Sequence, residues 1–484
     1  MSYAVVIGLY LRNSLFLIWN ASMKKPNIIL INCDDLGYGD VGCYGSTVNQ
    51  TPYLDQMAAE GMRFTDYHVM SPVCSASRGA LMTGCYPQRV GISGVLFPGE
   101  ANGLHPDEIT IADLLKKQGY CTKLVGKWHL GDQAAFLPTK HGFDSYYGLP
   151  YSNDMGIQGN TAAEREKRVP LPLMRDDEVI QQQPDLRGLT ERYAESCVNF
   201  IRENQDRPFF LYLAHMYVHV PLFVPDRFLR ESRNGGYGGA VACIDWVAGV
   251  IFAELQRLGL DEDTMVIFTS DNGSRASGEG GSNHPLRGTK GTTWEGGQRV
   301  PCIVRWPGCV PAGHVSDEKI TSMDFLPTLA RIAGTKEPQD RMIDGKDVTP
   351  IFMGDEAAKS PHTTFCYYMQ NRLHAIRKGD WKLHFAAGAM FSANPAAVQE
   401  LYNLADDIGE TQNVYDQHPD IVAELEALAD KAREDLGDAL QGIAGKGCRA
   451  AGYVENPRPL TVQDKNHPYL VAYYDMADSP TMMG

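Results

Sequence analysis

The chain has 484 residues, of which 43% are hydrophobic and 21% charged, an ordinary globular composition that suffices for one large domain and a smaller one. The net charge of −15 argues against a nucleic-acid partner, because binding to a duplex draws on clustered Lys and Arg. The 11 cysteines include no C-x-x-C pair and match neither a disulfide framework nor a zinc pattern, which favours a reducing compartment.

An N-terminal extension, residues 1–23, precedes the first predicted strand. Residues 4–19 are mostly apolar, but Arg12 and Asn13 interrupt a run that is too short for a comfortable transmembrane helix. A signal peptide would require a Lys or Arg before its apolar run, and this chain has none there. Met23, with two lysines after it, has the features of a natural start. We therefore expect a misassigned start and a cytoplasmic protein, with export through a signal-like segment as the alternative.

The first predicted strand ends in a pair of carboxylates. Residues 27–33 form a continuous apolar run, the pattern of a strand buried on both faces. Asp34 and Asp35 follow at its carboxyl end, where open α/β sheets place their functional sites. The alternative is a pair of aspartates that only cap a loop.

The stretch 71–84 predicts a helix that begins close to a cysteine. Ser75 or Ser77 can cap this helix, and Gly84 can end it. Cys74 then lies at a helix N-terminus, where backbone N–H groups and the helix dipole favour negative charge. The alternative is a buried core cysteine before a short helix.

A predicted helix at 108–119 leads to a strand at 120–126, and this strand delivers Lys127 and His129 at its end. The two residues are two positions apart, so in an extended chain both side chains point the same way. A cation beside an imidazole suits an anion site, although two solvated polar residues at a strand end are the alternative. The turn-rich, aromatic segment 139–154 suits a loop over a site.

Two histidines and a lysine follow later strands. The buried strand 208–214 runs into His215 and His219, and each could instead be a hydrogen-bonded structural histidine. A Gly-rich segment, 278–297, surrounds Lys290. Flexible turns around a lysine suit an anion clamp, or equally a plain surface loop.

A second buried strand, 264–270, ends in Asp271 and Asn272. Two buried strands therefore end in paired oxygen-bearing side chains. Four hard oxygen ligands, with no thiolate or imidazole among them, suit Ca²⁺ or Mg²⁺ and not Zn²⁺. Taken together, the two strand ends make a pair of unrelated loop caps the weaker interpretation.

The other predicted elements complete the chain. Residues 155–187 are polar without a clear period and resemble a variable insertion. From about Thr363 the sequence changes character, and residues 374–384 predict a hairpin. The further helices are expected at 53–61, 190–204, 240–258, 324–332 and 421–436, and the further strands at 64–69, 300–306 and 400–404.

The stretch from Cys74 onward, Cys-x-Ala-x-Arg running into Leu-x-Thr-Gly, resembles the signature of the type I, formylglycine-dependent sulfatases. The commonest form of that signature has Pro where this chain has Ala76, and the Ala form also occurs. Gly-Lys-Trp-His at 126–129 and both carboxyl pairs match in the same order, so the resemblance covers nearly all of 24–415.

The resemblance implies an alkaline-phosphatase-like α/β fold. A large mixed β-sheet sandwiched by helices would occupy residues 24–362, and a smaller α+β subdomain with an antiparallel sheet would occupy residues 363–484. The loops at 93–107, 139–187 and 274–289 would shape the pocket for the leaving group.

The resemblance also implies a role for each candidate residue. A maturation enzyme would oxidise Cys74 to formylglycine, whose hydrated aldehyde is the nucleophile. Asp34, Asp35, Asp271 and Asn272 would bind Ca²⁺, with Mg²⁺ as second choice, together with residue 74. Arg78 and Lys127 would hold the hydrated aldehyde, and His129 would act as the base. His219 and Lys290 would grip the sulfate and protonate the leaving alcohol. Ser152 would contact the sulfate.

The expected function is hydrolysis of sulfate monoesters, with a sulfated carbohydrate as substrate and aryl sulfates as artificial substrates. A phosphomonoesterase or phosphodiesterase of the same superfamily is one alternative, and a non-catalytic binder of sulfated glycans is another. A thiol hydrolase that uses Cys74 with His129 would leave the four-oxygen site unexplained. Trp294, Arg287, His284 and Tyr151 could contact a glycan or merely pack.

Overall fold

The computed structural model describes residues 25–157, 168–390, 392 and 394–464. The expected N-terminal extension, 1–23, lies outside the described residues, and so do residues 465–484 of the expected C-terminal subdomain.

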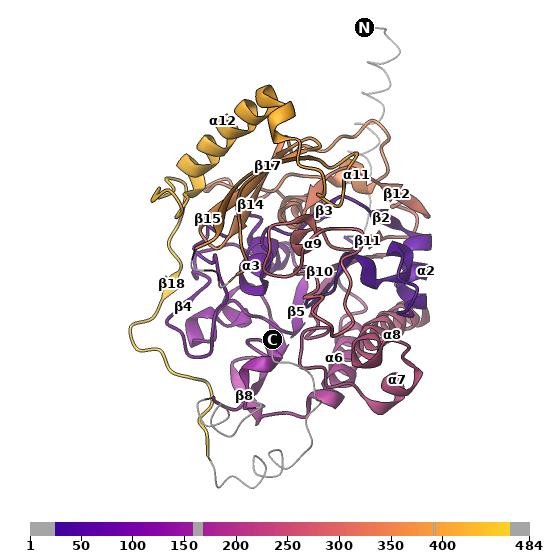
Figure 1. The fold of residues 1–484 in the computed structure, drawn as a ribbon. Helices are drawn as coiled ribbons and strands as arrows, with labels where there is room; N and C mark the ends of the chain where they lie inside the picture. Colours follow the sequence, from indigo (N-terminus) through magenta and orange to yellow (C-terminus); the bar gives the residue numbers. More distant parts are fainter. Residues whose placement is uncertain (1–24, 158–167, 391, 393, 465–484) are drawn as a thin grey trace.

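A ten-stranded mixed sheet forms the centre of the molecule (Figure 1). Its inner strands β10, β1, β9, β5 and β6 run parallel to one another, whereas β11, β7 and β8 are antiparallel to their neighbours. In spatial order the strands are β12 (His314–Ser316), β2 (Met62–Phe64), β11 (Cys302–Arg305), β10 (Thr264–Ser270), β1 (Asn27–Cys33), β9 (Phe209–Ala214), β5 (Cys121–Gly126), β6 (Ser145–Gly148), β7 (Pro172–Arg175) and β8 (Glu178–Gln182). The expected large mixed sheet is confirmed.

Helices cover both faces of this sheet, because its central strands are apolar on both sides. In β1, Ile29 and Ile31 join one hydrophobic core, whereas Ile28 and Leu30 join the core on the opposite face. The first core packs under α2 (Pro52–Glu60), α6 (Leu189–Glu203) and α8 (Gly235–Leu258), and the second under α3 (Cys74–Thr83), α4 (Ile111–Lys117) and α10 (Phe325–Ile332). The shorter helices are α7 (Asp226–Glu231), α9 (Glu295–Gln298) and α11 (Thr349–Phe352).

A four-stranded antiparallel sheet forms the smaller C-terminal unit, and α12 (Pro419–Leu436) packs across it (Figure 1). Gly379, with φ of +57°, supplies the left-handed residue in the predicted turn. The strands are β14 (Thr364–Met369), β15 (Arg372–Lys378), β16 (Trp381–Ala387) and β17 (Ala396–Asn403).

Several predicted elements differ from the structure. The single strand expected at 64–69 is two short strands, because β3 (Tyr67–His68) leaves the main sheet and pairs with β13 (Ile320–Thr321). The expected insertion at 155–187 contains β7 and β8, which extend the main sheet at its edge. Near the C-terminus, β18 (Gly452–Tyr453) pairs with β4 (Asn102–Gly103).

Helix α8 begins at Gly235, five residues before the predicted start, because four glycines in its first turns hide the helical pattern. Among the described residues it is the one helix long and apolar enough to span a membrane, but 78% of its most apolar stretch is buried inside the protein, as in a core helix.

Candidate active site

The two predicted carboxyl pairs meet at one edge of the main sheet. β1 and β10 pair in parallel with Cys33 opposite Ser270, so the residues that follow leave the sheet side by side. The backbone N–H of Asp35 donates to Asp271 Oδ1 at 3.2 Å, and Asn272 Nδ2 donates to Asp35 Oδ1 at 2.7 Å. These four residues, Asp34, Asp35, Asp271 and Asn272, are buried, and with their three cations described below we name them the strand-end cluster.

Three cations neutralise the three carboxylates of this cluster. Lys127 Nζ lies 2.7 Å from Asp34 Oδ2, and Lys290 Nζ lies 2.8 Å from Asp35 Oδ2. Arg78 Nε donates to Asp271 Oδ2 at 2.9 Å. Lys127 and Arg78 come from different elements, so the fold gathers here the predicted cations that are far apart in the sequence.

Cys74 is the first residue of α3, as predicted, but the predicted cap is wrong. Val73 is the N-cap residue and offers no side-chain hydrogen bond. Ser75 lies inside the helix, where its hydroxyl accepts from the backbone N–H of Leu96. The first turn of α3 therefore has no side-chain acceptor at its N-cap, which suits an anion at this end of the helix.

The thiol of Cys74 faces the strand-end cluster. Its Sγ and carboxylate oxygens of Asp34 and Asp271 all lie within 4.8 Å of one another. Burial raises the pKa of the Cys74 thiol, although Lys127 and Lys290 pull it down. A thiol held protonated is a poor nucleophile, which argues against a thiol hydrolase.

His129 and His219 both line the pocket beside Cys74. The chain at His129 has φ of +63°, so it turns there, and the extended geometry expected for Lys127 and His129 is wrong. Burial, with Lys127 and Arg78 nearby, holds the pKa of His129 well below its ordinary value, so the ring is neutral. Its Nε2 lies 2.9 Å from the carbonyl oxygen of Leu96, and its Nδ1 has no hydrogen-bond partner among the described residues.

His219 Nε2 lies 3.7 Å from Asp35 Oδ2, and its Nδ1 contacts the carbonyl oxygen of Val220. Burial and then Lys290 lower the pKa of His219 to about 4. His215 is fully buried but is absent from the described pocket lining, so it is the weaker candidate of the two.

A pocket of about 480 Å³ opens above Cys74. Ser152, Lys290 and the two histidines line it with Cys74, and the hydroxyl oxygen of Ser152 has no hydrogen-bond partner among the described residues. The three predicted loops all contribute walls, through Val95, Phe97, Asp154, Met155, Arg275, Ser277 and Thr289. The loop between β16 and β17 adds Ala389, Met390 and Ser392, which the sequence did not predict.

None of the four residues proposed as possible glycan contacts lines this pocket. Trp294 stacks on His384, with ring centroids 4.1 Å apart, and the Arg287 guanidinium lies 3.5 Å from the centre of the Trp294 ring. Tyr151 is buried at 2% exposure. Trp294 and Arg287 therefore pack against the C-terminal sheet.

The donor set of the strand-end cluster fits a hard divalent cation. Asp34 Oδ1 and Asn272 Oδ1 are buried and have no hydrogen-bond partner in the described part of the chain. A buried oxygen that lacks a donor is costly unless a cation satisfies it. Burial raises the pKa of Asp271 to about 6, and Arg78 offsets this only in part, so the three cations do not fully compensate for the burial of this carboxylate. The oxygen-only set is the one that Ca²⁺ or Mg²⁺ prefers.

The mixed sheet between helices, with oxygen-bearing side chains and a helix N-terminus gathered at the carboxyl ends of its strands, is an alkaline-phosphatase-like arrangement. The family model described as Sulfatase matches residues 26–335, and the model described as N-sulphoglucosamine sulphohydrolase, C-terminal, matches residues 289–435. The chain belongs to the sulfatase family.

Individual relatives agree with this assignment. Arylsulfatase A of Bos taurus is 39% identical over 440 residues, which cover 84% of this chain and 86% of the relative. N-acetylgalactosamine-6-sulfatase of Canis lupus familiaris is 41% identical over 384 residues, which cover 75% of this chain and 72% of the relative. The crystal structure of PsFucS1 sulfatase from Pseudoalteromonas sp. has a TM-score of 0.77 and 29% identity, and covers 85% of this chain and 91% of that one.

Proposed function

We propose that this enzyme hydrolyses sulfate monoesters with a formylglycine made from Cys74 and a Ca²⁺ ion held by Asp34, Asp35, Asp271 and Asn272. The observation that carries the proposal is that two buried oxygens, on Asp34 and Asn272, have no hydrogen-bond partner among the described residues, while Asp34 lies close to Cys74 on the wall of a pocket. A bound Ca²⁺ supplies charge neutralisation on sulfuryl oxygens and a lower pKa for an adjacent hydroxyl.

The modified residue explains why a cysteine stands at this position. A hydrated aldehyde offers two hydroxyls, one to attack sulfur and one to release the ester, whereas a serine or cysteine offers only one group. We assign Arg78 and Lys127 to hold those hydroxyls, and the closeness of Lys127 to Cys74, whose pKa it lowers, supports the assignment. A maturation enzyme that reads the sequence around Cys74 is therefore the partner that the proposal requires.

The protein's own residues supply the proton transfers. His219 and Lys290 line the pocket on the Asp35 side, and we assign them the grip on the sulfate and the proton for the leaving alcohol. His219 is neutral in the free site, and the negative charge of a bound sulfate ester would favour its protonated form. His129 is neutral and lies on the pocket wall, so we assign it removal of the proton from the second hydroxyl of residue 74. Ser152, whose hydroxyl is unpaired among the described residues, is a further sulfate contact.

We propose a sulfated carbohydrate as the natural substrate. A pocket of this volume takes one or two sugar units, and Phe97, 47% exposed on its wall, offers a flat apolar face. The names of the relatives include both arylsulfatase and N-acetylgalactosamine-6-sulfatase, and they support sulfate esters of sugars together with aryl sulfates as artificial substrates.

The test compares sulfate release with phosphate release. The purified enzyme, matured in vivo, is given 4-nitrophenyl sulfate and 4-nitrophenyl phosphate at equal concentrations, and then defined sulfated saccharides. We expect sulfate release to dominate. Faster phosphate release, together with two metals or zinc in the chain, would instead favour a phosphatase, and no release with tight saccharide binding would favour a glycan binder.

We also propose that the enzyme works in the cytoplasm. All 11 cysteines are free, which supports a reducing compartment. A chain that starts at Met23 should be fully active. Removal of residues 1–22 during export, detected in the N-terminal peptide of the native protein, would support secretion.

A further inference from the structure

The segment that carries Lys290, residues 289–295, has little regular structure of its own before α9 begins at Glu295. On the side of the catalytic site, two backbone hydrogen bonds hold it. The N–H of Lys290 donates to the carbonyl oxygen of Ser274, and the N–H of Gly291 donates to that of Pro72, both at 2.9 Å. Gly291 has φ of +75° and lies with Lys290 in a turn that the N–H of Thr292 closes by donating to the carbonyl oxygen of Thr289 at 3.0 Å. This turn fixes the local shape of the segment, and contacts outside it must fix its position.

The far end of this segment is held by the C-terminal unit. Lys382 Nζ, on β16, donates to the carbonyl oxygen of Thr293 at 2.9 Å. Glu410 Oε2 accepts from the backbone N–H of Glu295 at 2.8 Å. Between these two contacts, Trp294 stacks on His384. Two buried side chains of the C-terminal unit thus hold the segment by its backbone.

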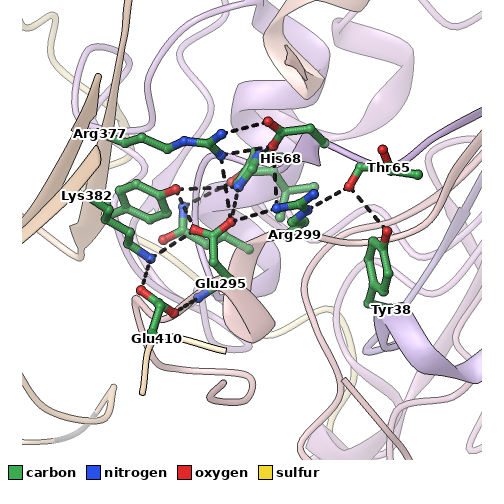
Figure 2. A network of polar contacts seen from close by, with 12 residues as sticks. Tyr38, Thr65, His68, Glu295, Arg299, Arg377, Lys382 and Glu410 are labelled. Atoms are coloured by element: carbon green, nitrogen blue, oxygen red, sulfur yellow. Dashed lines mark hydrogen bonds and ion pairs between the residues drawn. The ribbon is translucent and has the colours of Figure 1, made fainter. Parts of the chain in front are cut away.

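Lys382 and Glu410 belong to a larger buried cluster that joins the two units (Figure 2). Lys382 Nζ lies 3.0 Å from Glu295 Oε1 and 2.8 Å from Glu410 Oε1, and all three side chains are fully buried. We name this cluster the interface network, and its members are Asp66, His68, Glu295, Arg299, Tyr367, Arg377, Lys382, His384 and Glu410.

The interface network is electrically balanced. Asp66, Glu295 and Glu410 supply three negative charges, against the three positive charges of Arg299, Arg377 and Lys382. Burial lowers the pKa of both His68 and His384, so neither adds a charge. The loss of one anion together with one cation therefore leaves no net buried charge.

We propose that Lys382 and Glu410 are positioning residues for Lys290, so that the C-terminal unit is part of the catalytic apparatus. The inference rests on the proposed function, because it takes Lys290 as the group that grips sulfate and shares protonation of the leaving alcohol. A lysine on a glycine-rich segment delivers its ammonium group accurately only if its backbone is fixed. Lys382 and Glu410 supply that anchor three to five residues from Lys290.

The test is the charge-balanced variant Lys382→Met with Glu410→Leu. Displacement of a catalytic group by about 1 Å can cost about 100-fold, so we expect kcat for an alkyl or sugar sulfate to fall about 10- to 100-fold. The loss for 4-nitrophenyl sulfate should be several times smaller, because its leaving group needs no proton. Lys290→Ala should show the same dependence on the leaving group.

Adding Lys290→Ala to the double variant tests whether Lys382 and Glu410 act through Lys290, because a purely structural role would lower the rate of the Lys290→Ala enzyme further. If the two residues act through Lys290, the triple variant should be no slower than Lys290→Ala alone. The inference is overturned if the two losses multiply, if the folded double variant retains full kcat, or if Lys290→Ala lacks the leaving-group dependence.

The matched control is Arg89→Met with Asp344→Leu. This pair, with Arg89 buried and Asp344 partly exposed, also joins a cation to a carboxylate, at 2.7 Å. It also holds backbone groups, since Arg89 donates to the carbonyl oxygen of Gly447 and Asp344 accepts from the N–H of Tyr86. It does not touch the Lys290 segment, so the ratio of alkyl to nitrophenyl rates should stay at the wild-type value. A shifted ratio in this control would overturn the inference, because any damage at the interface would then suffice.

If Lys382→Met with Glu410→Leu does not fold, it is replaced by Lys382→Met with Glu410→Gln, which keeps an acceptor for the N–H of Glu295. The inference is then decided by the same ratio of alkyl to nitrophenyl sulfate rates. A failure of the proposed function is distinguishable, because the wild-type enzyme itself would then release no sulfate from any ester.

Discussion

Two buried clusters of this molecule have nearly the same charged groups and different uses. The strand-end cluster and the interface network each contain three carboxylates and three fixed cations. Side chains close enough to hold a metal ion occur at both, namely Asp34 and Asp271 with Cys74 at the first, and Asp66, His68 and Glu295 in the second. In the interface network every carboxylate oxygen has a donor. For example, Arg377 donates to both oxygens of Asp66, at 3.0 and 2.8 Å.

The strand-end cluster differs in two respects. Two of its oxygens, Asp34 Oδ1 and Asn272 Oδ1, have no hydrogen-bond partner among the described residues, and a pocket opens beside it. Charge count and burial therefore do not distinguish a reaction centre from a structural joint. Buried oxygens without a hydrogen bond, next to an accessible pocket, do distinguish them. Such oxygens destabilise the free protein, and a bound ligand can satisfy them.

Replacement of Cys74 should produce the largest effect. We expect Cys74→Ala, and separately Cys74→Ser, to lower kcat by at least about 10⁴-fold, the order of loss seen when a nucleophile is removed. Both variants should unfold within a few degrees of the wild type in a thermal melt, because the side chain changes little in volume. A Cys74→Ser variant with substantial turnover would contradict the view that the reaction takes place beside the strand-end cluster with a nucleophile made from Cys74.

Removal of metal should separate the two clusters next. Chelation or Asp271→Ala should abolish most activity. Added Ca²⁺ should raise the melting temperature of the wild type until the site is saturated. The free energy of unfolding should increase by about 2.7 kcal/mol when the concentration of free Ca²⁺ is 100 times Kd. Asp271→Ala should lose this response to Ca²⁺.

The control for the metal experiment is Asp66→Asn in the interface network, which should be less stable but should still respond to Ca²⁺. Elemental analysis should find one Ca²⁺ or Mg²⁺ per chain. The account separates a strand-end cluster that binds Ca²⁺ from an interface network that does not. Three results would argue against it: zinc in the chain, two metals per chain, or loss of the Ca²⁺ response in Asp66→Asn.

The two pocket histidines should differ in the step that they affect. His129→Ala should release one equivalent of phenol from an aryl sulfate and then stall, with a steady-state loss of about 10²- to 10⁴-fold, the usual contribution of a general base. His219→Ala should instead lose most on alkyl sulfates and little on nitrophenyl sulfate. Rapid mixing measures both, and the absence of a phenol burst in His129→Ala would show that the roles are wrongly assigned.

The smallest expected effect is at the pocket wall. Phe97→Ala should raise KM for a sulfated saccharide several-fold and leave kcat nearly unchanged, since loss of one aromatic contact costs about 1 kcal/mol. KM for methyl sulfate, which cannot reach that wall, should not change. A fall in kcat for both substrates would place Phe97 closer to the chemistry.

The sequence predicted the strands of the site well, because their signal is local. β1 and β10 are apolar on both faces and end directly in oxygen-bearing residues, so their bounds and the cluster at their ends could be read from the pattern. The resemblance to sulfatases then implied the remaining residues around Cys74.

The parts that were missed depend on tertiary structure. β7 and β8 lie at the edge of the main sheet, and β8 is largely solvent-accessible, so no apolar pattern marks it. The interface network joins Asp66 to Arg377, which are 311 positions apart, and nothing near either residue in the sequence indicates the other. The wall contributed by Met390 likewise depends on how the two units pack.

The most direct test of the central claim is the mass of the peptide that contains Cys74 and Arg78, taken from enzyme whose sulfatase activity was measured in the same preparation. We expect the mass loss that corresponds to conversion of the cysteine side chain to an aldehyde, in a fraction of molecules that matches the fraction of active sites. Full activity in a preparation whose Cys74 is entirely an unmodified thiol would contradict the account.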